Sequence, residues 1–396
     1  MTISLEVIAT LAVATCILVL GNVVKQSVSF LHRYNLPAPV IGGLLAALTL
    51  MASQKLGWQI KFDSSIKTPL MLAFFTSLGF AASLKLLKMG GKYVLIFLSI
   101  SIFAAILQNV LGASVAWAMG LPPLFGVLCG SVTLTGGPAT GLAFAPQFES
   151  AGITGAESIA VAAAMCGIIM GGVMGGPIGT VLMRRLQANH QSLHANHQQS
   201  LFKLDITTTS SEQELLKSVG LLVVAMWLGS FISQFFTSVN ITLPAYIGAM
   251  LAAAILRNLN DLYQWFKIDH EQVEQLGGVA LSYFLVLSLM GLDLSKLTAV
   301  ALPLLILIIL QVLLMAMLSM TLIFKFMGKD YEAAVTATGF YGFMMGTTAN
   351  AMANMDAFVK RYSPSPRAYL VVPIVGAFFI DFANTLLIQF CLNVFS

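Results

Sequence analysis

The chain has 396 residues, of which 58% are hydrophobic and only 9% are charged, and its mean hydropathy is +0.89. A soluble domain has roughly 25% charged residues, so this composition excludes a soluble globular fold. The formal net charge of +4 is small and gives no sign of a nucleic-acid partner. Long apolar runs, rather than short alternating segments, exclude a β-barrel and predict an all-α integral membrane protein of the lipid bilayer.

Apolar segments of membrane-crossing length follow one another along the whole chain. A bilayer core requires about 20 apolar residues per helix. We predict ten transmembrane helices, over residues 4–24, 37–53, 68–84, 93–119, 154–183, 216–238, 244–256, 275–292, 299–324 and 368–393. Two further apolar segments, 121–148 and 331–359, are interrupted by Gly, Pro, Thr and Asn, and we expect them to form re-entrant hairpins.

The lysines and arginines predict the orientation of these spans. With the N-terminus outside, only four of the 20 Lys and Arg residues lie outside the cell, namely Lys55, Lys61, Lys67 and Lys296. Cytoplasmic loops of membrane proteins carry an excess of positive charge. We therefore expect both termini outside and a cytoplasmic linker over 184–217, the longest polar stretch.

The two halves of the chain resemble each other in sequence. LPAPVIGGLLAALTL begins at Leu36, and LPAYIGAMLAAAIL begins at Leu243. In the same order, MGLPPLFGVLCGSVT from Met119 matches MGKDYEAAVTATGFY from Met327. Such ordered matches predict an internal duplication.

The duplication predicts two domains on either side of the linker. The first is a five-helix repeat over 1–183 with its hairpin near 121–148, and the second is a repeat over 218–396 with its hairpin near 331–359. Because five is an odd number, the second repeat must cross the membrane in the opposite direction. Inverted repeats with broken helices near the midplane are typical of secondary transporters.

The first broken stretch, SVTLTGGPATG, offers groups that suit an anion and a small cation. Its glycines let a ligand approach the backbone, and a helix that starts near Ala139 presents free N–H groups to a carboxylate. We predict substrate contacts at Ser131, Thr135, Gly136, Gly137 and Thr140. We expect Thr133 to supply an oxygen ligand for sodium.

The second broken stretch, FYGFMMGTTANAMANM from Phe340, repeats this pattern. We predict substrate contacts at Gly346, Thr347 and Thr348. Asn350 and Asn354 are four residues apart, so they share one helical face and are predicted sodium ligands. The alternative is that the small residues of both tips only allow close helix packing.

Asp381 lies deep in the last predicted span, with Asn384 three residues later on the same face. An acid at this depth is costly and suggests a function. The two residues are predicted to bind sodium; alternatively, Asp381 carries a proton or bonds to a hairpin backbone. No histidine or cysteine is expected beside Asp381, so we expect a transporter rather than an enzyme.

Several long motifs resemble the glutamate:sodium symporter family of bacteria. They include SVSFLHRYNLPAPVIGGLL (27–45), DSSIKTPLMLAFFTSLG (63–79), GSVTLTGG (130–137), MGKDYEAAV (327–335), ANMDA (353–357) and LVVPIVGAFFIDFAN (370–384). The resemblance implies sodium-coupled uptake of glutamate across the bacterial inner membrane, and a homodimer. It also implies inverted five-helix halves with re-entrant hairpins, of which the hairpin-bearing part moves like an elevator against a scaffold.

The chain departs from the family pattern at both tips. Pro138 and Ala139 follow the double glycine where the family tends to have a histidine, and residues 342–350 differ from the usual second motif. Both departures fall where the substrate or ion should bind. The alternative is therefore a sodium- or proton-coupled carrier of a dicarboxylate or hydroxycarboxylate.

Overall fold

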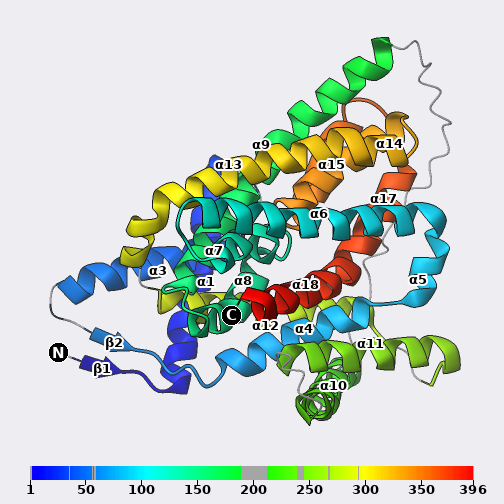
Figure 1. Cartoon of the computed structure of the whole chain (residues 1–396). Helices are drawn as coiled ribbons and strands as arrows, with labels where there is room; N and C mark the ends of the chain where they lie inside the picture. The colour runs from blue at the N-terminus through cyan, green and yellow to red at the C-terminus, as the bar shows by residue number, and fades with distance from the viewer. Residues whose placement is uncertain are drawn as a thin grey trace.

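Helices form almost all of the structure, a computed structural model that describes residues 2–34, 36–55, 57, 59–188, 212–238, 245–265, 268–292 and 294–395 (Figure 1). The elements of the first half are β1 (Thr2–Ser4), α1 (Val7–Ser27), α2 (Ser29–Arg33), α3 (Ala38–Lys55), β2 (Gln59–Lys61), α4 (Lys67–Ala81), α5 (Leu84–Met89), α6 (Gly91–Ala118), α7 (Pro123–Val127), η1 (Leu128–Val132), α8 (Gly137–Ser150) and α9 (Ala156–Ala188). The elements of the second half are α10 (Glu212–Ser238), α11 (Ala245–Tyr263), α12 (His270–Met290), η2 (Leu294–Val300), α13 (Ala301–Leu318), η3 (Ser319–Ile323), α14 (Phe324–Phe326), α15 (Tyr331–Met344), α16 (Thr348–Val359), α17 (Pro366–Ile374), η4 (Val375–Phe379) and α18 (Ile380–Phe395).

The long helices have the length and composition of membrane spans. Within the described residues, six helical runs are long and apolar enough to cross a bilayer: α1, α6, α9, α10, α12 and the continuous run from α13 to α14. Their outer faces carry many exposed apolar side chains, among them Trp117, Trp227 and Leu302. Such large apolar surfaces are stable only in contact with lipid or protein. The chain is therefore an integral membrane protein.

Each predicted span coincides with a helical segment, but the first one starts later than expected. Residues 2–4 form a short strand, β1, which pairs in parallel with β2 and aligns Thr2 with Gln59. The predicted span over 4–24 is α1, which begins at Val7. The all-α class is confirmed, and these two short strands were not predicted because a three-residue strand leaves no periodicity in the sequence.

The helices on either side of the predicted linker extend into it. α9 continues to Ala188 and α10 begins at Glu212. Only the ends of the stretch over 184–217 are thus helical in the described part of the chain. Residues 189–211, which include most of the predicted linker, lie outside the described residues.

The helices pack in two groups. One group contains α1, α3, α4, α10, α11 and α12, and the other contains α6 to α9 and α13 to α18. In Figure 1 the first group includes α4, α10 and α11 at the bottom, and the second includes α6, α9 and α13 at the top. An apolar layer joins them, with Val40 of α3, Leu142 of α8, Val161 of α9 and Leu289 of α12 all buried in it.

Glycines allow the LPA helices, α3 and α11, to approach the helix that precedes each of them. A methyl group built on Gly42 of α3 would lie 2.3 Å from a carbonyl oxygen of Ile17 in α1. One built on Gly248 of α11 would lie 2.3 Å from the carbonyl oxygen of Gly229 in α10. Because no side chain fits at these distances, both matched halves use the same kind of close helix crossing.

Candidate functional site

The first predicted hairpin is a broken helical hairpin. The chain enters through α7 and the π-helical segment η1, and it breaks at Gly130, whose φ and ψ are −102° and −127°. It resumes as α8 at Gly137, with Pro138 in the first turn. Gly137 has a φ of +69°, which L side chains rarely adopt. The sequence GGPATG thus turns the chain and starts a helix whose N–H groups face the turn.

The second predicted hairpin is formed by α15 and α16. The chain turns at Met345 and Gly346, and the Thr347 hydroxyl accepts a hydrogen bond from the backbone N–H of Asn350 at 3.4 Å. This contact caps α16 at its N-terminus. α15 is buried from Ala333 to its end at Met344.

The tips of the two hairpins meet inside the protein. A methyl group built on Gly137 would lie 3.6 Å from the carbonyl oxygen of Gly346 and 3.9 Å from Cγ2 of Thr347. The predicted substrate residue Gly137 is thus brought next to Gly346 and Thr347, more than 200 residues later in the chain.

Gln108 of α6 connects both hairpins. Its side-chain amide donates to the carbonyl oxygen of Met344 at 3.0 Å, and its Oε1 accepts from the hydroxyl of Thr135 at 2.6 Å. The backbone carbonyl oxygen of Gln108 accepts from Nε2 of Gln311 at 2.8 Å. Gln108 and Gln311 have no exposed surface. Buried polar groups need such partners, so this network fixes the position of both tips relative to α6 and α13.

Ser131 connects the first hairpin to α6 and to α18. Its backbone N–H donates to Oδ1 of Asn109 at 3.1 Å, and its carbonyl oxygen accepts from Nδ2 of Asn384 at 2.9 Å. Sequence reasoning identified Ser131 and Asn384 but missed Asn109. A polar amide in the apolar sequence of α6 was the available signal.

Several buried polar atoms around the tips have no hydrogen-bond partner within the described part of the chain. They are the side-chain oxygens of Ser131, Tyr341, Asn350, Asn384 and Gln311 and the side-chain nitrogen of Asn109. An unpartnered buried polar atom costs about 1–3 kcal/mol. Hydroxyl and amide oxygens are hard ligands that suit a small hard cation. The residues present therefore fit sodium.

Asn350 and Asn354 hold α16 against the glycine-rich face of α9. The side-chain amide of Asn350 donates to the carbonyl oxygen of Ile168 at 2.8 Å, and that of Asn354 donates to the carbonyl oxygen of Gly171 at 2.9 Å. A methyl group built on Gly175 would lie 2.3 Å from Asn354. The amide nitrogens of both residues therefore serve helix packing, while Oδ1 of Asn350 stays without a partner in the described residues.

The remaining predicted site residues are divided between the hairpins and the last span. Thr133 donates to the carbonyl oxygen of Leu128 at 2.8 Å, and Thr140 is buried beside Gly136. Thr348 donates to the carbonyl oxygen of Gly376, in the π-helical segment η4, at 3.3 Å. Asp381 begins the first turn of α18, and no hydrogen bond or ion pair joins it to another described residue.

Comparison with known proteins shows the family of the chain. The family model described as sodium/glutamate symporter matches residues 3–364. The chain belongs to the sodium/glutamate symporter family. It is 39% identical to the "Sodium/glutamate symporter" of Escherichia coli (strain K12) and to that of Shigella flexneri, in each case over 388 residues that make up 97% of both chains.

A third relative supports the same assignment. The "Sodium/glutamate symporter" of Haemophilus influenzae is 35% identical over 389 residues, which cover 96% of this chain and 95% of the relative. The resemblance predicted from the motifs is thus confirmed over nearly the full length. Because the family is one of symporters, the protein is a membrane transporter and not an enzyme.

Proposed function

We propose that this member of the sodium/glutamate symporter family imports glutamate, or a closely related acidic amino acid, together with sodium. The observation that carries the proposal is the meeting of two broken hairpins, with Gly137 and Gly346 in close approach and unpartnered oxygens around them. Relatives at 39% and 35% identity carry the name sodium/glutamate symporter.

The proposed site uses the backbone for the anion and side-chain oxygens for the cation. The first N–H groups of α8 receive a substrate carboxylate, because the N-terminus of a helix carries free donors and a positive dipole end. Ser131, Thr135, Thr140, Thr347 and Thr348 contact the substrate. Sodium binds among oxygens of Thr133, Asn350, Asn354, Asp381 and Asn384. Its charge offsets that of the anion, which couples the two binding events.

We propose that the two matched halves are inverted repeats of five spans, over 1–183 and 218–396, each with its own re-entrant hairpin. The paired crossings at Gly42 and Gly248 support the duplication. The helix contacts support it too, since α3 packs on α12 while its counterpart α11 packs on α4, the matching span of the other half.

The two packing groups support an elevator movement. The group with α6 to α9 and α13 to α18 contains both hairpins, and the group with α3 and α11 forms the scaffold. Few contacts join the groups, and the layer around Leu142 and Leu289 is apolar, so it can slide without breaking hydrogen bonds. The hairpin group carries its cargo past this layer.

The membrane location, the orientation and the assembly of the protein are part of the same proposal. Its relatives are bacterial, which supports a location in the inner membrane, and the charge distribution supports a multi-pass chain with both termini outside. A homodimer is the expected assembly, in which the scaffolds of two copies support each other.

A second candidate cargo is a dicarboxylate or hydroxycarboxylate, carried with sodium or protons. Pro138 and Ala139 favour it, because they replace the family's usual pattern at the first tip. Purified protein in liposomes would test both cargoes. We expect an inward sodium gradient to drive uptake of labelled L-glutamate, and excess unlabelled L-glutamate to compete more strongly than L-malate or 2-oxoglutarate. Stronger competition by L-malate would favour the second cargo.

A further inference from the structure

A cavity of about 540 Å³ lies at one end of the molecule, apart from the hairpin tips. Its walls come from the ends of α3, α4, α9 and α12 and from the strand β2 with the turn that follows it. The strand pairing places the N-terminal residues Thr2–Ser4 at the same end. Ligand pockets have about this volume. The cavity therefore has room for a small organic molecule.

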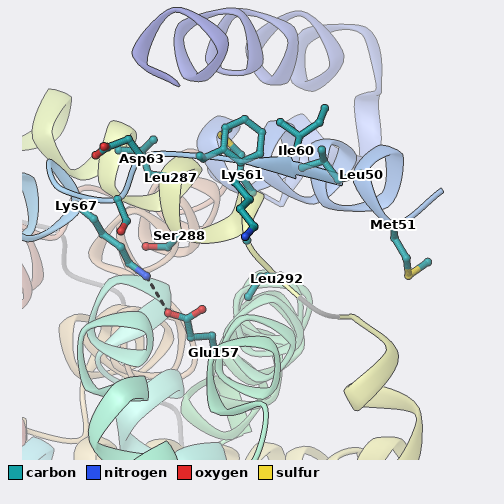
Figure 2. A pocket seen from close by; sticks show the side chains of 14 residues that line it. Leu50, Met51, Ile60, Lys61, Asp63, Lys67, Glu157, Leu287, Ser288 and Leu292 are labelled. Atoms are coloured by element: carbon teal, nitrogen blue, oxygen red, sulfur yellow. Dashed lines mark hydrogen bonds and ion pairs between the residues drawn. The ribbon is translucent and has the colours of Figure 1, made fainter. Parts of the chain in front are cut away.

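Two lysines line this cavity, and one of them has no anionic partner. The ammonium group of Lys61 points into the cavity in Figure 2, and no described carboxylate lies within ion-pair distance of it. Asp63 also lines the cavity, but its carboxylate accepts the backbone N–H of Ser65 at 2.8 Å and points away from Lys61. The hydroxyl of Ser65, followed by its backbone N–H, lowers the pKa of Asp63. Lys61 thus offers an unpaired positive charge.

The second lysine forms an ion pair between the two helix groups. Nζ of Lys67 in α4 lies 2.8 Å from Oε1 of Glu157 in α9, shown as a dashed line in Figure 2. The side chains are 25% and 26% exposed, so water and ligands reach them. The hydroxyl of Ser288, whose residue is only 1% exposed, also lines the cavity and has no partner among the described residues. The cavity is therefore lined by two cations and two carboxylates, those of Asp63 and Glu157, and the unpartnered hydroxyl of Ser288 is buried in its wall.

We propose that this cavity is a second, vestibular binding site for the acidic amino acid that the hairpins transport. The α-carboxylate of the ligand binds Lys67, its ammonium group binds Glu157 and the Ser288 hydroxyl, and its side-chain carboxylate binds Lys61. The ligand's α-carboxylate thus replaces Glu157 as the partner of Lys67, and its ammonium group replaces Lys67 as the partner of Glu157. This arrangement favours a zwitterion with a second carboxylate over a simple dicarboxylate, which has no ammonium group for Glu157.

The vestibular site is separate from the hairpin tips. Between them lies the apolar layer that contains Leu142 of α8, Val161 of α9, and Phe284 and Leu289 of α12. When a ligand occupies the vestibular site, the ion pair of Lys67 and Glu157 between the two helix groups is replaced by contacts to the ligand. Occupation of the site therefore loosens one of the few polar links between these groups before the cargo reaches the tips. This inference rests on the proposed function only for the identity of the ligand.

Protection of an introduced cysteine from a thiol reagent tests the site without a transport measurement. Ser64 is exposed and lines the cavity, so Ser64→Cys reports on it, whereas Ser150→Cys, exposed at the end of α8, is the matched control. Both are placed in a Cys16→Ser background, because Cys16 is exposed. The purified variants in nanodiscs react with a maleimide in sodium-free buffer, where both faces are accessible. We expect millimolar L-glutamate to slow labelling of Ser64→Cys about threefold or more and to leave Ser150→Cys unchanged.

Two further variants show whether charge provides the protection. Adding Lys61→Gln to Ser64→Cys should abolish the protection, whereas Lys296→Gln, on the same predicted face but outside the cavity, should preserve it. L-malate should protect less than L-glutamate. If wild-type protein takes up glutamate but L-glutamate leaves the labelling rate of Ser64→Cys unchanged, the vestibular site is wrong. If L-glutamate protects Ser64→Cys but wild-type protein takes up no glutamate, the site stands and the proposed function fails.

Discussion

The side-chain amide of Asn384 in α18 donates a hydrogen bond to the carbonyl oxygen of Ser131 in the first hairpin, 2.9 Å away. These residues are 253 positions apart in the chain. The bond joins the last span to the hairpin at the point where η1 breaks, and it leaves Oδ1 of Asn384 and the hydroxyl of Ser131 unpartnered in the described residues. Asn384 therefore positions the hairpin and keeps an unpartnered amide oxygen, which the proposed site assigns to sodium.

Asn384→Ala should weaken both sodium binding and folding. The change removes one oxygen from the proposed sodium site, and we expect the half-saturating sodium concentration for uptake to rise about tenfold, which corresponds to roughly 1.4 kcal/mol. Loss of the buried hydrogen bond should lower the free energy of unfolding by about 1–3 kcal/mol. Gln389→Ala, on the same helix but bonded to Asn393, is the control and should leave the sodium dependence unchanged. A sodium dependence like that of the wild type would argue against a role for Asn384.

Gly137→Ala should impair transport because of the backbone at the first tip. Gly137 has a φ of +69°, and an L residue in this region costs about 1–2 kcal/mol. The added methyl group would also lie 3.6 Å from the carbonyl oxygen of Gly346, in the space between the tips. We expect sodium-driven uptake to fall roughly 5- to 30-fold.

Gly176→Ala in α9 is the matched control for that prediction. A methyl group there meets no atom within 4 Å. Replacing a helical glycine by alanine should raise the free energy of unfolding by up to about 1 kcal/mol and leave uptake intact. Equal losses of uptake in Gly137→Ala and Gly176→Ala would show that transport does not depend on the backbone conformation at the first tip.

Reversing the charges of Lys67 and Glu157 should reveal the link between the two helix groups. Lys67→Glu alone places two carboxylates where the 2.8 Å ion pair now lies, and it should slow uptake by altering the balance between conformations. Lys67→Glu combined with Glu157→Lys should restore most of the rate. The effect of the pair on the free energy of unfolding should stay within about 1 kcal/mol, since both side chains are partly exposed. If the uptake rate of the double variant is reduced by the product of the two single-variant reductions, the result would contradict this link.

The thermal stability of the protein should depend on pH through His270, at the start of α12. Nη1 of Arg257 lies 2.6 Å from Nδ1 of His270, a contact that requires a neutral ring. A proton on Nδ1 would remove this acceptor and would place a second positive charge beside Arg257.

The sign of the effect follows from this contact. The unfolded chain binds a proton near the ordinary value of about 6.5, but the folded chain does not, so His270 contributes stability above that pH and loses it as the pH falls further. We expect the Tm in detergent to decrease from pH 7.5 to 5.0, and His270→Gln to flatten this decrease. An unchanged profile in His270→Gln would assign the pH dependence to other groups.

The local elements of this fold follow closely from the sequence, because apolar runs and breakers determine them. The hairpins predicted over 121–148 and 331–359 correspond to α7–α8 over Pro123–Ser150 and α15–α16 over Tyr331–Val359. The double glycine at Gly136 and the threonine at Thr347 mark where each second helix starts. These signals are local, so a single sequence contains them.

Contacts between distant segments were harder to predict. Asn109, Lys61 and the pairing of Lys67 with Glu157 were missed, because periodicity places a residue on a helix face but does not say which helix lies opposite. Glu157 lies in the first turn of α9, and only the structure shows its partner. The orientation of the chain, the roles of the tip residues and the sodium ligands remain predictions.

The binding of L-glutamate to purified protein, measured by calorimetry with and without sodium, tests the central claim most directly. If sodium and the substrate meet at the hairpin tips, sodium should raise the affinity for L-glutamate at least about tenfold. Asn384→Ala should reduce this enhancement, while Gln389→Ala should keep it. An affinity for L-glutamate that is the same in sodium and in potassium would contradict the account.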